Sequence, residues 1–312
     1  MTIPILNARD PIPAHLHGGI AALGNFDGFH LGHQAVAGEA IAQAKAAGKP
    51  AIIATFDPHP VRYFAPHVPP FRLTTLNQRQ RLFEAADADA MLVFEFDAEL
   101  ANTTAEDFIA KLLVERLGLS GVVTGEDFTF GKGRGGNISV LQERGAEVGL
   151  TSTAVGPVRD EGGVISSSRI RDALKAGDCA TANQLLTRPF AVEGVVQHGD
   201  KNGRKLGFPT ANIDMGHYLR PRYGVYAVRG KMPDGRVLDG AANLGIRPQF
   251  DPPKELLEPH FFDFDGDLYG QSIEVEFHAF LRPEAKYDGL DALMEQIGRD
   301  CEDAKVALAG LG

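Results

Sequence analysis

Short apolar runs and helix-like segments alternate along the first part of the chain. The predicted strands are Ile20–Leu23, Pro50–Phe56, Ala90–Phe96, Ser120–Glu126 and Val148–Val155. The predicted helices are Gln34–Gly48, Asn77–Ala86, Thr104–Gly118 and Ser139–Gly145, and the alternation continues to about Leu186. Thr104 is a suitable N-cap, and Gly118 ends the helix that follows it. Strands and helices alternating in this way predict a doubly wound parallel sheet, an α/β fold.

The second part of the chain consists of consecutive strand-like runs separated by turns. These runs are Phe190–Gly199, Gly224–Gly230, Arg236–Gly245, Leu256–Phe264 and Ser272–Leu281. Such a series predicts a small antiparallel β-barrel. Leu293, Ile297 and Cys301 recur at helical spacing, so a C-terminal amphipathic helix is expected to pack on the barrel. The sequence therefore predicts two domains, 1–187 and 188–312.

Composition narrows the class of protein. The chain has 312 residues, 44% hydrophobic and 23% charged, which is ordinary for a globular protein with room for two cores. Its formal net charge of −10 argues against nucleic acid as a partner, because such binding relies on a basic face. Cys179 and Cys301 are far apart, and neither a signal peptide nor an apolar run of transmembrane length is visible. We expect a cytoplasmic protein with no disulfide and no membrane partner.

The stretch Gly19–His33, GIAALGNFDGFHLGH, joins the first predicted strand to the first predicted helix. Gly24 and Gly28 permit tight turns and close approach of a ligand. The helix start offers backbone N–H groups and the positive end of the helix dipole, which favour phosphate. His30 and His33 are three residues apart, so both imidazoles can reach one group, as phosphoryl or nucleotidyl transfer requires. The alternatives are two solvated histidines on a surface loop, or a metal pair without an evident third ligand.

A second glycine-rich stretch, GEDFTFGKGRGGN, spans Gly125–Asn137. It is interpreted either as a mobile loop on the phosphate or flavin side of a site, or as a flexible surface loop. Phe128 and Phe130 face an aromatic ligand in the first interpretation and anchor the loop in the core in the second.

The stretch ISSSRIRDAL, Ile165–Leu174, is polar at its start and helical afterwards. Ser166, Ser167 and Ser168 are good N-caps, and Arg169 and Arg171 fall in the first turns. Arginine offers bidentate hydrogen bonds to phosphate oxygens. The alternative is a capped surface helix with solvated arginines.

In the second part, GDKNGRKLGFPTANI spans Gly199–Ile213. Gly203 and Gly207 allow the backbone to approach a nucleotide closely. Thr210 and Asn212 supply hard oxygen donors suited to Mg²⁺ and phosphate. The pattern is not a Walker A loop, and by composition alone it is only a turn between strands.

Taken in order, these motifs resemble those of the bacterial bifunctional riboflavin kinase/FAD synthetase family over nearly the full chain. GNFDGFHLGH is similar to the nucleotidylyltransferase signature GxFDGxHxGH, and GRKLGFPTAN is similar to the riboflavin kinase signature GRxxGFPTAN. NLGIRPQF resembles NxGxRPTF, with Gln249 in the place of the usual threonine, and LLEPHFFDF places Glu258 at the family's catalytic glutamate. The resemblance implies an N-terminal nucleotidylyltransferase domain followed by a riboflavin kinase barrel.

The resemblance also implies the chemistry. Riboflavin receives the γ-phosphate of ATP to give FMN, and FMN receives AMP from a second ATP to give FAD and pyrophosphate, each step with Mg²⁺. The implied catalytic residues are His30, His33 and Arg171 for AMP transfer and Glu258 as the kinase general base. The implied nucleotide or phosphate contacts are Gly24, Asp27, Gly28, Ser166, Ser167, Ser168, Arg169, Gly203, Gly207, Thr210 and Asn212, the last two also with Mg²⁺. The flavin-side candidates are Asp127, Phe128, Phe130 and Arg247.

Two other functions stay open. The first part alone could adenylylate another phosphate ester, although a kinase-like second part supplies FMN directly. The whole chain could instead be a flavin-binding sensor with degenerate sites, although no motif residue that we regard as essential is missing.

Overall fold

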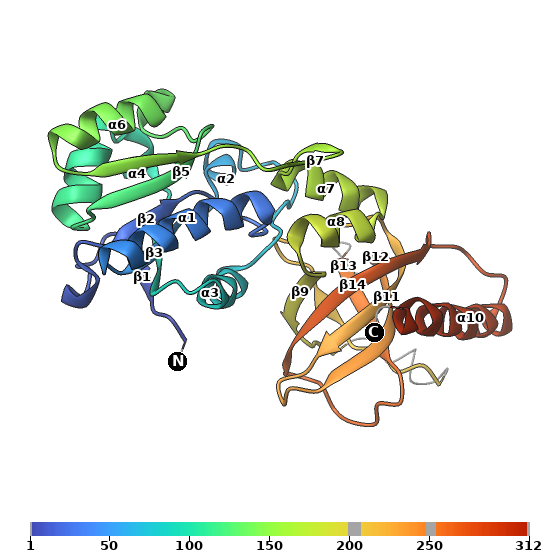
Figure 1. Cartoon of the computed structure of the whole chain (residues 1–312). Coiled ribbons are helices and arrows are strands. Elements are labelled where there is room, and N and C mark those ends of the chain that lie inside the picture. Colours follow the sequence, from blue (N-terminus) through green and yellow to red (C-terminus); the bar gives the residue numbers. More distant parts are fainter. Residues whose placement is uncertain (1, 199–206, 248–253, 311–312) are drawn as a thin grey trace. The chain divides into compact units, whose positions relative to one another are not determined.

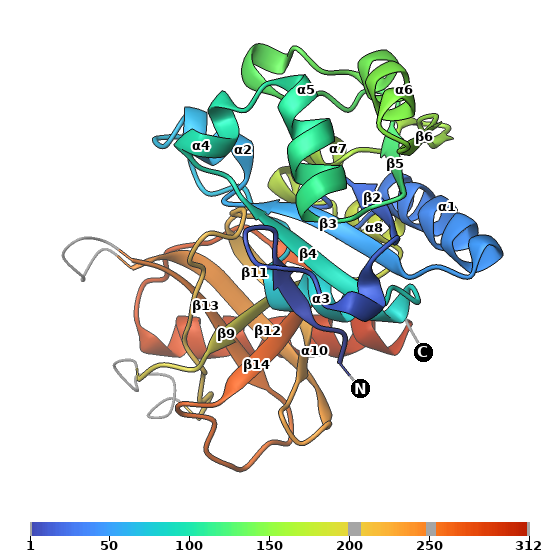
Figure 2. The same cartoon turned by 90° about the vertical axis from the view of Figure 1, so that its left-hand side faces the viewer.

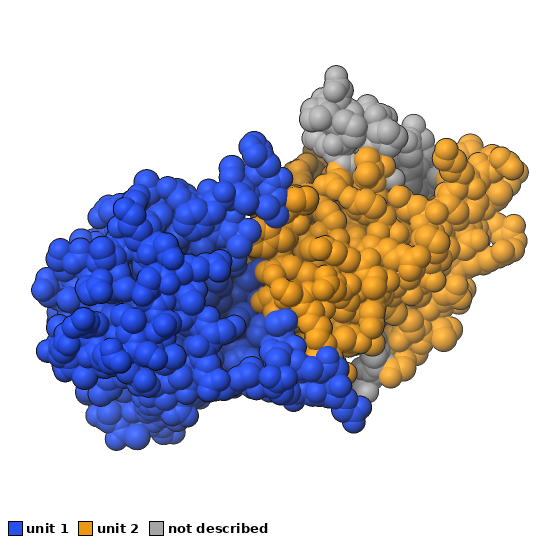
Figure 3. All heavy atoms as spheres, turned by 90° about the horizontal axis from the view of Figure 1, so that it is seen from above, with its two compact units in different colours: residues 1–68, 75–166 blue, residues 69–74, 167–312 orange. Residues whose placement is uncertain are grey.

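The structure, a computed structural model, describes residues 2–198, 207–247 and 254–310, so the predictions for Gly203 and Gln249 lie outside the described residues. The chain divides into two compact units, which are coloured separately in Figure 3. The first comprises Met1–Val68 and Thr75–Ser166, and the second comprises Pro69–Thr74 and Ser167–Gly312. The predicted boundary between 187 and 188 is a statement about function and stays a prediction.

The first unit contains a six-stranded parallel sheet in the order β1–β4–β3–β2–β5–β6. Its strands are β1 (Ile5–Asn7), β2 (Ile20–Leu23), β3 (Ala51–Asp57), β4 (Ala90–Glu95), β5 (Gly121–Gly125) and β6 (Thr151–Val155). The predicted parallel sheet is confirmed, and the short edge strand β1 is an addition that the sequence pattern did not predict. A small hairpin of β7 (Arg159–Asp160) and β8 (Gly163–Val164) follows the sheet.

Helices cover both faces of this sheet (Figures 1 and 2). Successive residues of β2 alternate between two cores, because side chains along a strand point to opposite faces. Leu23 lies in a core with Leu113, and Ala22 lies in a core with Val36 and Phe83. The helices are α1 (Leu31–Ala47), α2 (Pro60–Phe64), α3 (Leu76–Ala85), α4 (Ala98–Asn102), α5 (Ala105–Asp107), which continues as a π-helical stretch (Phe108–Arg116), and α6 (Ile138–Glu147).

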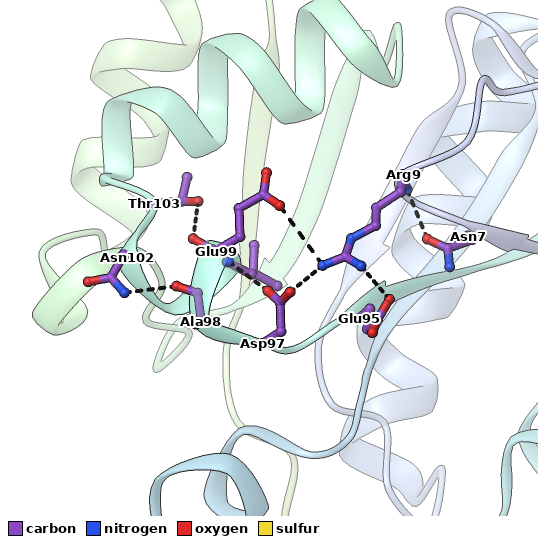
Figure 4. A network of polar contacts seen from close by, with 9 residues as sticks. Asn7, Arg9, Glu95, Asp97, Ala98, Glu99, Asn102 and Thr103 are labelled. Carbon is purple, nitrogen blue, oxygen red and sulfur yellow. Dashed lines mark hydrogen bonds and ion pairs between the residues drawn. The ribbon is translucent and has the colours of Figure 1, made fainter.

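The edge strand β1 is tied to its neighbour β4 by a charged cluster at the ends of the two strands (Figure 4). Arg9 contacts Glu95 at 2.7 Å, Glu99 at 4.0 Å and also Asp97. The backbone N–H of Leu100, and then the Arg9 guanidinium, hold the pKa of Asp97 below its usual value. These side chains are exposed, so the cluster contributes little to stability and serves mainly to fix the strand end.

The second unit contains a six-stranded antiparallel sheet in the order β10–β13–β12–β11–β14–β9. A bridge between Gln197, after β9, and Asn212, before β10, brings the two ends of that order together. The sheet is therefore a nearly closed barrel, as predicted. Its strands are β9 (Phe190–Val195), β10 (Ile213–Asp214), β11 (Gly224–Lys231), β12 (Val237–Arg247), β13 (Lys254–Phe261) and β14 (Ser272–Arg282).

The described residues of the second unit include the helices α7 (Ser167–Ala176), α8 (Cys179–Leu186) and α10 (Leu290–Ala309). The predicted C-terminal helix is confirmed, and it buries Ala304 and Leu308 against Ala227 of the barrel. Cys179 and Cys301 are buried free thiols, as expected, and burial raises the pKa of Cys179 to about 12. Within the described ranges, no helix combines the length and apolar character needed to span a bilayer.

Candidate active sites

His30 caps the first helix of the parallel sheet. It occupies the N-cap of α1, and its Nδ1 accepts hydrogen bonds from the backbone N–H groups of Gly32 at 3.1 Å and His33 at 3.4 Å. An atom that accepts from two N–H groups carries no hydrogen, so in the neutral ring the hydrogen lies on Nε2. This corrects one part of the sequence argument, since the imidazole already engages two of the N–H groups expected to meet phosphate.

The two histidines of the loop lie together. Their rings stack with centroids 3.6 Å apart and an interplanar angle of 20°. Gly32 between them is closely packed, because a Cβ there would lie 3.1 Å from the His30 ring and 3.2 Å from the carbonyl oxygen of Ile165, so these neighbours would have to shift by a few tenths of an ångström. The same contact places the backbone that precedes Ser166 beside the start of α1. The structure thus brings His30 and His33 together, and their catalytic roles stay predictions.

The rest of the loop is buried and tightly turned. Phe26 and Phe29 have positive φ values of 46° and 43°, a backbone conformation that residues other than glycine rarely adopt. Gly28 has a φ of 90°. Asp27 is only 2% exposed. A Cβ at Gly24 would lie within 3.1 Å of the Phe26 ring. The surface-loop alternative is therefore wrong, because this loop is packed into the unit.

The second glycine-rich stretch is anchored by one of its two aromatic residues. Phe130 is 7% exposed, lies 5.2 Å from the Phe108 ring and exchanges two backbone hydrogen bonds with Gly136. Phe128 stacks on Phe130 at 5.7 Å and is only half-buried. Phe130 thus anchors the loop in the core, as the second interpretation expects. Phe128 and the exposed Asp127 keep solvent-accessible surface that a ligand can contact.

The serine- and arginine-rich motif spans the division between the units. Ser166 ends the first unit, whereas Ser167, Ser168, Arg169 and Arg171 belong to the second. Within the second unit, the Arg171 Nε donates to the carbonyl of Phe71 at 2.8 Å, and its guanidinium lies 5.2 Å from the centre of that ring. The roles predicted for these side chains toward ATP are untested.

The barrel contains a cavity of about 350 Å³ at one end of β13. Thr210 and Asn212 line it, as do Asp265, Asp267 and Tyr269. Their hydroxyl, amide and carboxylate oxygens fit a hard cation such as Mg²⁺. In the described part of the chain, no three His, Cys, Asp or Glu side chains are grouped so that they could hold a metal alone.

Asp265 and Asp267 are cavity residues that sequence reasoning missed. They lie between the predicted strands Leu256–Phe264 and Ser272–Leu281, where the sequence pattern indicated a turn. The signal that could have found them is the pair of carboxylates two residues apart, directly after the strand that carries Glu258. Tyr269, which was also missed as a site residue, contacts the ring of His198 at 3.9 Å.

Glu258 does not line the cavity with Thr210 and Asn212. Its neighbours Pro259 and Phe261 do, and because strand residues alternate, Glu258 lies on the opposite face of β13. There it is half-buried and directly across the ladder from Asn243.

Two further predicted site residues of this unit are Gly207 and Arg247. Gly207 has a φ of 83°, so the turn requires glycine at this position. Arg247 ends β12, and its side chain lies outside what the structure describes.

The turn that carries Thr210 is held at two points by β13. His260 Nδ1 lies 2.8 Å from the carbonyl oxygen of Pro209, so this nitrogen carries the hydrogen. The N–H of Ala211 donates to the carbonyl of Pro259 at 2.9 Å. These contacts fix the backbone on both sides of Thr210.

The parallel doubly wound sheet with paired histidines and the antiparallel barrel with an oxygen-lined cavity are features expected of a two-domain protein that binds nucleotide phosphates. An FAD synthetase family model matches residues 12–169, and a riboflavin kinase family model matches residues 186–308. The chain is 38% identical over 283 residues to a bifunctional riboflavin kinase/FMN adenylyltransferase of Escherichia coli strain K12, covering 91% of this chain and 90% of the relative. It therefore belongs to the bifunctional riboflavin kinase/FMN adenylyltransferase family.

Other comparisons span the whole chain. A relative with the same description from Bacillus subtilis strain 168 is 36% identical over 309 residues, covering 97% of this chain and 96% of the relative. A crystal structure described as a macrolide-efflux protein from Streptococcus pneumoniae has a TM-score of 0.86 at 28% identity, covering 98% of this chain and 99% of that one.

Proposed function

We propose that the chain phosphorylates riboflavin in domain 188–312 and adenylylates the resulting FMN in domain 1–187. The observation that carries this proposal is the presence of both family matches, residues 12–169 and residues 186–308, in one chain. The substrates are riboflavin, FMN and ATP. Two free, buried cysteines support a reducing compartment such as the cytoplasm.

In adenylyl transfer, an oxygen of the FMN phosphate attacks the α-phosphorus of ATP, and the bond to pyrophosphate breaks. Negative charge on the transferring phosphate is then met by the stacked imidazoles of His30 and His33. His30 uses Nδ1 to cap α1, and we assign its Nε2–H to the transferring phosphate. Arg171 and the serines 166–168 are assigned to ATP phosphates from the motif.

In riboflavin phosphorylation, the terminal hydroxyl of riboflavin attacks the γ-phosphorus, and ADP leaves. Glu258 takes the hydroxyl proton. Thr210 and Asn212 hold the nucleotide together with Mg²⁺, which supplies neutralisation of phosphate charge when bound. Because Glu258 lies on the other face of β13, riboflavin would approach from that face while the nucleotide occupies the cavity.

The test is a chromatographic assay with riboflavin and FMN as separate substrates, each with ATP and Mg²⁺. The enzyme yields FMN and FAD from riboflavin and FAD from FMN, whereas a flavin sensor returns both unchanged. Removal of divalent cations with a chelator should stop both reactions, and added Mg²⁺ should restore them. Adenylylation of another phosphate ester in preference to FMN would contradict the substrate assignment.

A further inference from the structure

Helix α3 places a charged side chain beneath the histidine loop. Arg79 is only 2% exposed, and its Nη1 donates to the Thr55 hydroxyl at 2.7 Å and to the Asn25 carbonyl at 3.2 Å. The Thr55 hydroxyl, itself fully buried, donates to the same carbonyl at 2.8 Å. Two donors therefore converge on one carbonyl oxygen, which has two lone pairs to receive them.

The carbonyl that they hold belongs to the residue before a strained turn. Asn25 precedes Phe26, whose positive φ persists only if its surroundings enforce it. Phe83, one helical turn after Arg79, packs on Phe26 with ring centroids 5.9 Å apart. Phe26 in turn lies edge-on to the His33 ring at 5.3 Å. A continuous set of contacts thus runs from α3 through the loop to one of the paired imidazoles.

Within this set of contacts, the Thr55 hydroxyl is the group that a substitution can remove with the least change in side-chain shape. Valine has the same shape but has no hydroxyl, so it would leave the Asn25 carbonyl with one donor and Arg79 with one acceptor fewer. The loop could then shift without any loss of apolar packing. Displacements of about 1 Å at a catalytic group cost up to roughly a hundredfold in rate.

We propose that Thr55 and Arg79 are positioning residues for adenylyl transfer, because they fix the Asn25 carbonyl and so the turn that sets the place of His33. They touch no reacting atom. The inference rests on the proposed function, in which the His30–His33 loop performs this transfer.

The experiment compares Thr55→Val with Thr55→Ser in the full chain. Thr55→Val should lower kcat for FAD formation from FMN by roughly tenfold to a hundredfold, with little change in KM. Thr55→Ser keeps the hydroxyl and should restore most of the rate. Riboflavin phosphorylation by the same samples is the internal control and should be unchanged. Arg79→Met should act in the same direction, and the double variant should lose less than the product of the two single losses, because one carbonyl is shared.

Equal rates for Thr55→Val and Thr55→Ser would overturn the inference. A fall of both activities together with the unfolding temperature would also overturn it, because the hydroxyl would then support only the fold. His30→Asn separates this failure from that of the proposed function. If His30→Asn loses FAD synthesis while Thr55→Val does not, only the positioning role is wrong. If His30→Asn keeps the parental rate, the site assignment is wrong and the inference falls with it.

Discussion

At the scale of single residues, His30 combines two tasks that are usually given to different side chains. Its Nδ1 satisfies two backbone N–H groups at the start of α1, where serine, threonine, asparagine or aspartate is the usual cap. The same bonds leave the hydrogen on Nε2 and fix the ring against His33. A side chain that caps a helix loses rotamer freedom, so the proposed donor is already oriented before ATP binds.

Asparagine and alanine at position 30 separate these two tasks. His30→Asn keeps an oxygen that can cap α1, whereas His30→Ala removes cap and ring together. Both should slow FAD formation by roughly a hundredfold or more, the cost of removing a donor from a developing charge. Only His30→Ala should also lose about 1 kcal/mol of stability, measured by denaturant unfolding. Rapid FAD synthesis by His30→Asn would show that the cap alone matters.

In the barrel, a substitution at Glu258 can likewise separate a catalytic role of the residue from a structural one. Glu258→Gln keeps size and removes the basic oxygen, so riboflavin phosphorylation should fall by about a hundredfold. Binding of Mg-ATP should persist, because Thr210 and Asn212 line the cavity on the other face of β13. Adenylylation of supplied FMN should be unchanged. The two activities are followed by chromatography, and a parallel fall in both would make Glu258 a structural residue.

At the scale of elements, local patterns predicted most of what the structure contains. The helix predicted over Gln34–Gly48 ends at Gly48, which has the left-handed conformation, and the Thr104 hydroxyl accepts from the Asp107 N–H at 3.1 Å, as its N-cap signal predicted. The strands from β2 to β6 lie within three residues of their expected bounds. These features depend on neighbours in sequence, and periodicity and capping report such neighbours directly.

Contacts between distant residues could not be predicted in the same way. NQRQRLFEAA has the composition of a solvated helix, yet Arg79 within it is buried beside residues 25 and 55. Glu258 and Thr210 belong to the same barrel, as expected, but because strand residues alternate, Glu258 lies on the face of β13 opposite to the cavity that Thr210 lines. Which face of a strand meets which loop depends on the pairing register of the strands and on how the barrel closes. The pattern of apolar and polar residues specifies neither the register nor the closure.

The cap of α8 is an element whose contribution depends on pH. Asp178 accepts from the Thr181 N–H at 3.0 Å, and hydrogen bonds from the Thr181 hydroxyl and N–H hold the pKa of Asp178 below its usual value. Asp178→Ala should cost about 1 kcal/mol at neutral pH. Because the pKa is lowered in the folded state, this stabilisation is fully present above the unfolded pKa of about 3.9 and is lost as pH falls through the folded value.

The measurement is the difference in unfolding free energy between the parent and Asp178→Ala across a pH series. The difference should be constant above about pH 5 and shrink below about pH 4. Thr181→Val removes the hydroxyl donor and should move that loss to higher pH. A difference that does not change with pH would mean that the carboxylate charge adds nothing to the cap.

At the scale of the whole molecule, the compact units and the family matches do not divide at the same residue. The riboflavin kinase match begins at residue 186, whereas the second compact unit already includes α7 and α8. Asn183 of α8 donates to the carbonyl of Phe277 at 2.9 Å and accepts from the N–H of Phe190 at 2.8 Å. The barrel is therefore packed by a helix that precedes its first strand.

Two fragments test whether the kinase domain needs this helix. Residues 188–312 contain every barrel strand, and residues 167–312 add α7 and α8. We expect both to phosphorylate riboflavin and neither to make FAD, since each lacks His30 and His33. The longer fragment should be more stable, because Leu185 and Leu186 are each 1% exposed and two buried leucines contribute on the order of 3 to 6 kcal/mol. Thermal unfolding of both fragments measures the difference. Equal stability would show that α8 adds nothing to the barrel, and FAD synthesis by either fragment would overturn the division of activities.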